Sequence, residues 1–175
     1  AVQQLLRHLK EEESVQEVSV RRHNCLSDRS YDVDAVLDLM IHELDLLTLF
    51  TDTEIESLHT EKGANFHRVA ATVTYASGLM ARFSVDRDAA EPVRDMVIQT
   101  SGATYTLDLT DQLLSRQSEE WRDDILVEPG DALHNQLRAF AAFVRTGRPA
   151  GATGQDGRSA LTVANRIRSA ARLLE

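Results

Sequence analysis

The chain has 175 residues, of which 42% are hydrophobic, and a formal net charge of −9. This length suffices for one domain with a substantial core, and the negative charge argues against nucleic acid or an anionic membrane as a partner. No apolar run is long enough to span a bilayer, and no signal-peptide pattern is present. Cys25 is the only cysteine and cannot form an internal disulfide, which suits a reducing compartment, so we expect a cytoplasmic protein.

The beginning of the chain predicts a helix, a strand and a loop in succession. Residues 1–13 place three leucines at helical spacing, which indicates a short helix that buries them. Residues 14–22 alternate valines with polar residues, as in a strand with one buried face. Residues 23–33 form a polar loop, whose side chains should lie near the start of the element that follows.

The segment 34–50 is the longest apolar run and has a helical period. Its main apolar face consists of Val36, Met40, Leu44 and Leu47. The polar residues Asp34, Asp38, His42 and Asp45 recur at spacings of four, four and three, so they form one stripe. Asp38 and His42 are neighbours on such a helix, and a carboxylate beside an imidazole is a common acid–base arrangement. A simple solvated face of the helix would give the same pattern, so both interpretations stay open.

The middle of the chain alternates apolar and polar residues, with turns between the runs, and predicts adjacent hairpins. We expect strands at 54–60, 67–75, 79–85, 93–100, 104–109, 113–117 and 125–127. A helix should then run from the N-cap Asp131 to about Thr146, with a core stripe of Leu133, Leu137, Phe140 and Val144. The last helix should begin at Asp156 or Arg158 and pack through small residues.

These elements predict an α+β fold: an open, mostly antiparallel β-sheet with helices packed on one face. The helices 34–50, 131–146 and 158–174 should cover that face. The opposite face is expected to be mixed in character, with five larger apolar side chains on it: Met80, Met96, Ile98, Tyr105 and Leu107. Exposed apolar patches often mark protein contacts, so we expect the domain to self-associate there as a homodimer or higher homo-oligomer.

Five segments resemble the Gfo/Idh/MocA oxidoreductases, and they follow one another in the same order as in that family. Residues 36–45, Val-Leu-Asp-Leu-Met-Ile-His-Glu-Leu-Asp, resemble the D-L-x-I-H-D-I-D signature of this family. Residues 15–22 and 93–102 resemble two of its strands, and residues 131–140 and 154–161 resemble its two closing helices. The family includes inositol, glucose–fructose and nucleotide-sugar dehydrogenases. Two positions depart from the usual pattern: glutamate replaces aspartate at 43, and alanine stands at 35, where glycine is frequent.

The resemblance implies a fold like the C-terminal domain of glyceraldehyde-3-phosphate dehydrogenase and NAD(P)-dependent oxidation of a secondary alcohol in a sugar, nucleotide-sugar or cyclitol. In that chemistry a base removes the hydroxyl proton while hydride leaves the adjacent carbon. By the same resemblance His42 would be the base or proton relay, and Asp38 would position it or bind a substrate hydroxyl. Arg22, Arg29 and Asp45 are the substrate-binding candidates.

Several motifs are not found in the sequence. It has no G-x-G-x-x-G after a strand, no P-loop, no zinc-ligand spacing among its six histidines and no Glu-Lys-Pro motif. We therefore expect residues 1–175 to be the substrate-binding and dimerisation domain of such an enzyme, without its N-terminal nucleotide-binding domain. NAD or NADP would bind only in the full-length enzyme, and this chain alone should be inactive. The alternative is a non-catalytic oligomerisation or ligand-binding module with the same fold.

Overall fold

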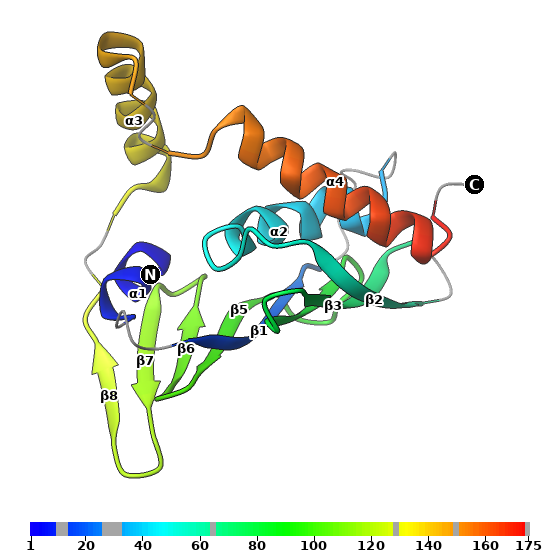
Figure 1. The fold of residues 1–175 in the computed structure, drawn as a ribbon, viewed down its shortest axis with the longest axis horizontal. Helices are drawn as coiled ribbons and strands as arrows, with labels where there is room; N and C mark the ends of the chain where they lie inside the picture. Colours follow the sequence, from blue (N-terminus) through cyan, green and yellow to red (C-terminus); the bar gives the residue numbers. More distant parts are fainter. Residues whose placement is uncertain (10–13, 26–32, 64–65, 128–129, 149–150, 174–175) are drawn as a thin grey trace.

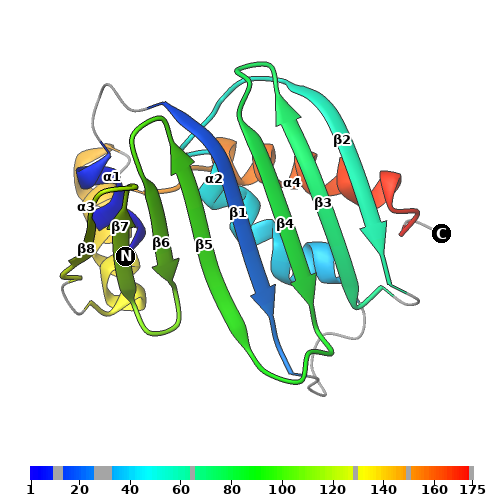
Figure 2. The same ribbon diagram turned by 90° about the horizontal axis from the view of Figure 1, so that it is seen from below.

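The computed structural model describes residues 1–9, 14–25, 33–63, 66–127, 130–148 and 151–173. Its centre is an eight-stranded sheet in the order β2-β3-β4-β1-β5-β6-β7-β8 (Figures 1 and 2). The strands are β1 (Val15–His23), β2 (Ile55–Lys62), β3 (Arg68–Tyr75), β4 (Met80–Asp86), β5 (Val93–Thr100), β6 (Thr104–Asp108), β7 (Leu113–Gln117) and β8 (Arg122–Ile125). The predicted strands are confirmed, apart from the last, which lies at 122–125 rather than 125–127.

Neighbouring strands are antiparallel except for the pair β1 and β4, which is parallel. The predicted mostly antiparallel, open sheet is thus confirmed. The parallel pair arises because the chain leaves β1 through a helical segment and returns to it as the meander β2-β3-β4 (Figure 2). The carboxyl ends of β1 and β4 therefore lie side by side at the same end of the sheet, where His23 is paired with Asp86.

The helices are α1 (Val2–His8), η1 (Val36–Met40), α2 (Ile41–Leu47), α3 (Ala132–Thr146) and α4 (Gly154–Ala170). Figure 1 shows η1, α2 and α4 above one face of the sheet, with α1 near the strands β7 and β8. Their buried side chains form one core with that face, which includes Leu5, Val36, Met40, Leu44 and Ile167. The first helix is shorter than predicted within the described residues, and its Leu6 is 37% exposed rather than buried.

The helix predicted at 34–50 consists of two parts. The backbone of η1 is π-helical, with Ile41 donating to the carbonyl of Val36 five residues earlier, and α2 continues as an α-helix to Leu47. The predicted apolar face is confirmed, because Val36, Met40, Leu44 and Leu47 are all buried. A π-turn inserts one residue into a helix and is often found at functional sites.

The apolar residues of the second hairpin lie on the covered face of the sheet, contrary to our prediction. Met96, Ile98, Tyr105 and Leu107 are each 0% exposed. Met96 pairs with Val20 and Ile98 with Val18, so register places them on the face that the helices cover. The alternation had shown which side chains share a face, but not which of the two faces the helices cover.

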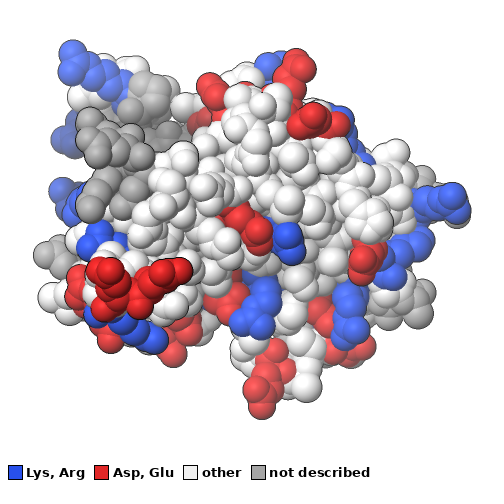
Figure 3. Space-filling model, turned by 60° about the horizontal axis from the view of Figure 1, so that its bottom comes forward, with Lys and Arg blue, Asp and Glu red and all other residues white. Residues whose placement is uncertain are grey.

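The open face of the sheet is instead polar. Charged side chains pair across its strands, Arg82 with Glu17 at 3.2 Å and Arg21 with Asp95. The half-buried Met80 and several hydroxyl-bearing residues lie on the same face: Ser19, Thr72, Thr74, Ser84 and Thr106. Figure 3 shows uncharged atoms over wide areas between the charged groups.

Helix α3 does not pack on the sheet, contrary to our prediction, and Figure 1 shows it standing away from the strands. Its apolar stripe is exposed: Leu133 by 64%, Leu137 by 59%, Phe140 by 63% and Val144 by 68%. The predicted ends are confirmed, since Asp131 Oδ1 accepts from the His134 amide and Gly147 adopts the left-handed conformation that glycine favours.

Helix α4 starts two residues before the predicted Asp156. Thr153 and Asp156 form a reciprocal capping box at its first turn. Ala160, Ala164 and Ile167 are buried against the core, as predicted. Among the described residues, no helix is long and apolar enough to cross a bilayer.

Candidate active site

Asp34 fixes the start of the helical segment that carries the predicted site. Its Oδ1 accepts from the amides of Val36 and Leu37 at 3.0 and 3.2 Å, which caps the free N–H groups of η1. Its Oδ2 accepts from Arg168 Nε at 2.6 Å, which connects η1 to α4. Asp34 is only 7% exposed, so this member of the polar stripe has a structural role.

Asp38 is held by an arginine that the sequence analysis did not single out. Arg87 Nη1 lies 3.4 Å from Asp38 Oδ2, and the Arg87 side chain is 8% exposed. The guanidinium also lies 5.6 Å from the centre of the Phe66 ring, a cation–π distance. Arg87 directly follows β4, so it reaches Asp38 only because β4 runs parallel to β1 beneath η1. A charged loop gives no such signal in the sequence.

His42 is exposed at the first turn of α2. Within the described residues, no hydrogen bond or ion pair joins it to Asp38, so the predicted contact between the two is not formed. The π-turn at 36–40 explains this, because an extra residue in the turn moves side chains four positions apart out of alignment. The anchored carboxylate and the accessible imidazole nevertheless lie on one continuous helical segment.

Glu43, the residue after His42, is buried between two arginines. Its Oε1 accepts from Arg22 Nη1 at 3.0 Å and from Arg94 Nη2 at 2.9 Å, while its Oε2 has no hydrogen-bond partner among the described residues. Glu43 is 1% exposed, whereas the arginine side chains are 20% and 37% exposed. Arg22, a predicted substrate-binding residue, is therefore partly exposed to solvent, and its guanidinium also connects β1 to α2 through Glu43.

Asp45 and Arg29 are the two remaining substrate-binding candidates. Asp45 is half-buried near the end of α2, where its carbonyl accepts from the Thr48 hydroxyl at 2.6 Å. Arg29 lies outside the described residues. The described part of the chain holds no cluster of His, Cys, Asp or Glu that could bind a metal ion.

This arrangement suits proton transfer. An imidazole exchanges protons near neutral pH and can act on a ligand that it can reach, and His42 is accessible. Asp38 and the guanidinium groups of Arg22 and Arg94 are partly exposed, so they could hold hydroxyl groups of a ligand beside it.

Comparison with known proteins identifies enzymes to which this chain is similar. UDP-N-acetylglucosamine 3-dehydrogenase of Acidithiobacillus ferrooxidans is 28% identical over 159 residues, which are 81% of this chain and 50% of that enzyme. A solved structure of the same enzyme has a TM-score of 0.91 and 26% identity, and covers 99% of this chain and 59% of the solved chain. The chain thus spans about half the length of the curated relative that it matches.

A more distant structure, aldose-aldose oxidoreductase of Caulobacter crescentus complexed with glycerol, has a TM-score of 0.83 at 15% identity. It covers 99% of this chain and 58% of its own, and at that identity it shows the fold alone. No protein-family model matches the sequence. The matched portion lies in the C-terminal part of these enzymes. The predicted resemblance is therefore confirmed: the structure of this chain matches the C-terminal portion of Gfo/Idh/MocA oxidoreductases over nearly its whole length.

Proposed function

We propose that this chain is the substrate-binding and dimerisation domain of an NAD(P)-dependent dehydrogenase. The enzyme would oxidise a secondary alcohol of a sugar, nucleotide-sugar or cyclitol. The observation that carries the proposal is that one helical segment presents both the accessible His42 and the anchored Asp38, on a fold shared with a UDP-N-acetylglucosamine 3-dehydrogenase at 28% identity.

Each candidate residue has a distinct role in this proposal. His42 takes the proton from the substrate hydroxyl as base or relay. Asp38, whose position Arg87 fixes, accepts a hydrogen bond from a neighbouring hydroxyl. Arg22, Arg29 and Asp45 bind the remainder of the substrate. The partly exposed guanidinium of Arg94 is a further candidate, since it shares Glu43 with Arg22.

The nicotinamide cofactor does not fit the described residues of this chain. A dinucleotide is usually held by its pyrophosphate on free N–H groups at a helix N-terminus. Here Asp34 caps η1, Asp131 caps α3, and Thr153 with Asp156 caps α4. Carboxylates at these positions would repel a pyrophosphate. We infer that NAD or NADP binds to another part of a longer protein and that this chain alone is inactive.

Two further parts of the proposal concern partners and location. The polar, uncharged stretches of the open sheet face would pair with a second copy of the chain (Figure 3). The free, exposed thiol of Cys25 would suit a reducing cytoplasm.

The test is an assay of the complete protein with NAD and NADP against UDP-N-acetylglucosamine, free hexoses and inositol. His42→Ala should lower turnover by roughly two to four orders of magnitude, the usual range for a general base. His59→Ala is the matched control, because His59 is exposed on β2 and should leave turnover unchanged. Near-normal turnover of His42→Ala at saturating substrate would rule out its role and favour a non-catalytic module.

A further inference from the structure

A cavity lies at the C-terminal end of the helical segment that carries His42. It has a volume of about 590 Å³ and lies between the end of α2, the first half of α4 and the start of β2. Its apolar lining comes from Leu44, Leu47, Ile55, Ala160 and Val163. Neither Asp38 nor His42 lines it, so it is separate from the candidate active site.

Tyr75 lies in the wall of this cavity. The residue as a whole is 6% exposed, but its hydroxyl, which makes no hydrogen bond to a described residue, is not among the fully buried polar atoms and is open to the cavity. Burial raises the pKa of Tyr75 to about 12, although the charge of Arg166 opposes the shift, so the hydroxyl stays a neutral donor at working pH. Since the hydroxyl is open to the cavity, it is available there as a donor to a ligand.

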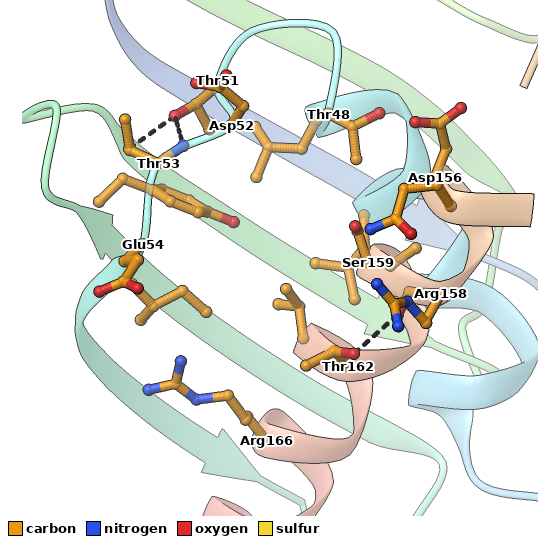
Figure 4. Close-up of a pocket in the computed structure, with 17 residues that line it drawn as sticks. Thr48, Thr51, Asp52, Thr53, Glu54, Asp156, Arg158, Ser159, Thr162 and Arg166 are labelled. Atoms are coloured by element: carbon orange, nitrogen blue, oxygen red, sulfur yellow. Dashed lines mark hydrogen bonds between the residues drawn. The ribbon is translucent and has the colours of Figure 1, made fainter. Parts of the chain in front are cut away.

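Positively and negatively charged side chains surround the opening of the cavity. Figure 4 shows Arg158, Ser159, Thr162 and Arg166 on the α4 side and Thr51 to Glu54 across the cavity. The guanidinium groups of Arg158 and Arg166 have no partner among the described residues, nor do the carboxylates of Asp52 and Glu54. A third carboxylate, Asp156, is occupied by the amide and hydroxyl of Thr153.

This charge balance selects the class of ligand. Two arginines face two available carboxylates, and Asp156 adds a further negative charge, so a phosphate or carboxylate ligand gains no net attraction. A neutral molecule with many hydroxyl groups satisfies both sets, because a hydroxyl accepts from arginine or tyrosine and donates to aspartate or glutamate. The apolar wall would contact the C–H faces of its ring.

We propose that this cavity binds a neutral, hydroxyl-rich ligand of the size of a mono- or disaccharide, at a site separate from the active site. The volume lies within the usual range for small-molecule sites. The proposal does not depend on the proposed dehydrogenase activity, since it uses none of the same residues.

The test is amide NMR of the 175-residue chain, titrated with methyl glucoside, N-acetylglucosamine and, as an anionic probe, UDP. The neutral sugars should shift the amides of Tyr75, Ser159 and Val163 in a saturable way. Tyr75→Phe removes one hydroxyl and should weaken this binding about threefold to tenfold, the range of one neutral hydrogen bond. Arg166→Met should weaken it as well, while Arg145→Met on α3 should not.

The dispersion of each variant's amide spectrum shows whether the variant is folded. Sugar binding by His42→Ala tests whether the cavity and the candidate active site are separate sites. Retained sugar binding by His42→Ala supports a separate site. Three results would overturn the proposal: no saturable shifts at these amides, tighter binding of UDP than of the neutral sugars at them, or sugar binding lost in His42→Ala but unchanged in Tyr75→Phe.

Discussion

Arg22 on β1 and Arg94 on β5 are direct cross-strand partners, and both donate to the same oxygen of Glu43. Like charges directly opposite each other destabilise a sheet. The buried carboxylate compensates for this repulsion and at the same time fixes α2 to the two central strands. His42, the preceding residue, is therefore positioned by the contacts of its chain neighbour.

The first prediction concerns this carboxylate. Glu43→Gln leaves two facing guanidinium groups without a counter-charge. The free energy of unfolding should therefore fall by about 2 kcal/mol. This loss is smaller than for a fully buried ion pair, because the two arginines stay in contact with water. Glu56→Gln, at an exposed position on β2, is the control and should change little. Urea denaturation measures both, and equal stability of the two variants would contradict the assigned role.

Asp34 makes two separable contacts, with the amides of η1 and with Arg168. Asp34→Ala removes both and should cost about 2–3 kcal/mol. Asp34→Asn keeps a capping oxygen and loses the ion pair, so thermal denaturation should place it between the wild-type protein and Asp34→Ala. If both variants were as stable as the wild type, the cap and the connection to α4 would contribute nothing.

Asp38→Asn should slow turnover in the complete protein and leave the fold intact, because the side chain is 26% exposed. Arg87→Met should act in the same direction by releasing Asp38, with a larger loss of stability because Arg87 is buried. Steady-state kinetics beside a thermal melt distinguishes the two effects. Unchanged turnover in Asp38→Asn would limit Asp38 to a structural role.

The raised pKa of Tyr75 should make the folded chain less stable at alkaline pH. Its pKa is raised from 10.0 to about 12, so the unfolded chain loses the phenolic proton at a lower pH than the folded chain. The folded state therefore loses stability as the pH rises from 10 to 12, by about 1 kcal/mol between pH 9 and pH 11. Urea denaturation of Tyr75→Phe should lack this part of the decrease, and an identical decrease in both proteins would contradict the shift.

The open face predicts self-association at micromolar concentration. Met80→Glu places a carboxylate among the hydroxyl groups of that face, next to its own copy in a two-fold interface, and should shift the chain toward monomer. Leu161→Glu, at an exposed position on α4, is the control. Sedimentation velocity decides, and a wild-type chain that is monomeric throughout would count against this interface.

The sequence predicted most strands and the buried side of the central helix because both follow from local periodicity. It could not predict Arg87, because only the parallel pairing of β4 with β1 brings this residue under Asp38. The π-turn was also missed, since the apolar spacing of Val36, Met40 and Leu44 in the sequence is the same as that of an ordinary α-helix. The side chains of α3 show the same limit, because an amphipathic pattern predicts a face to be covered but not what covers it.

The exposed stripe of α3 has a consequence for how this chain unfolds. An isolated helix of 15 residues is only marginally stable in water, and the Asp131 cap with the Gly147 end adds little to it. Without packing of its apolar stripe, α3 should lose its structure well before the sheet does. Amide hydrogen exchange should then show two cooperative units in the chain, a slow one centred on β1, β4 and β5 and a fast one that consists of α3.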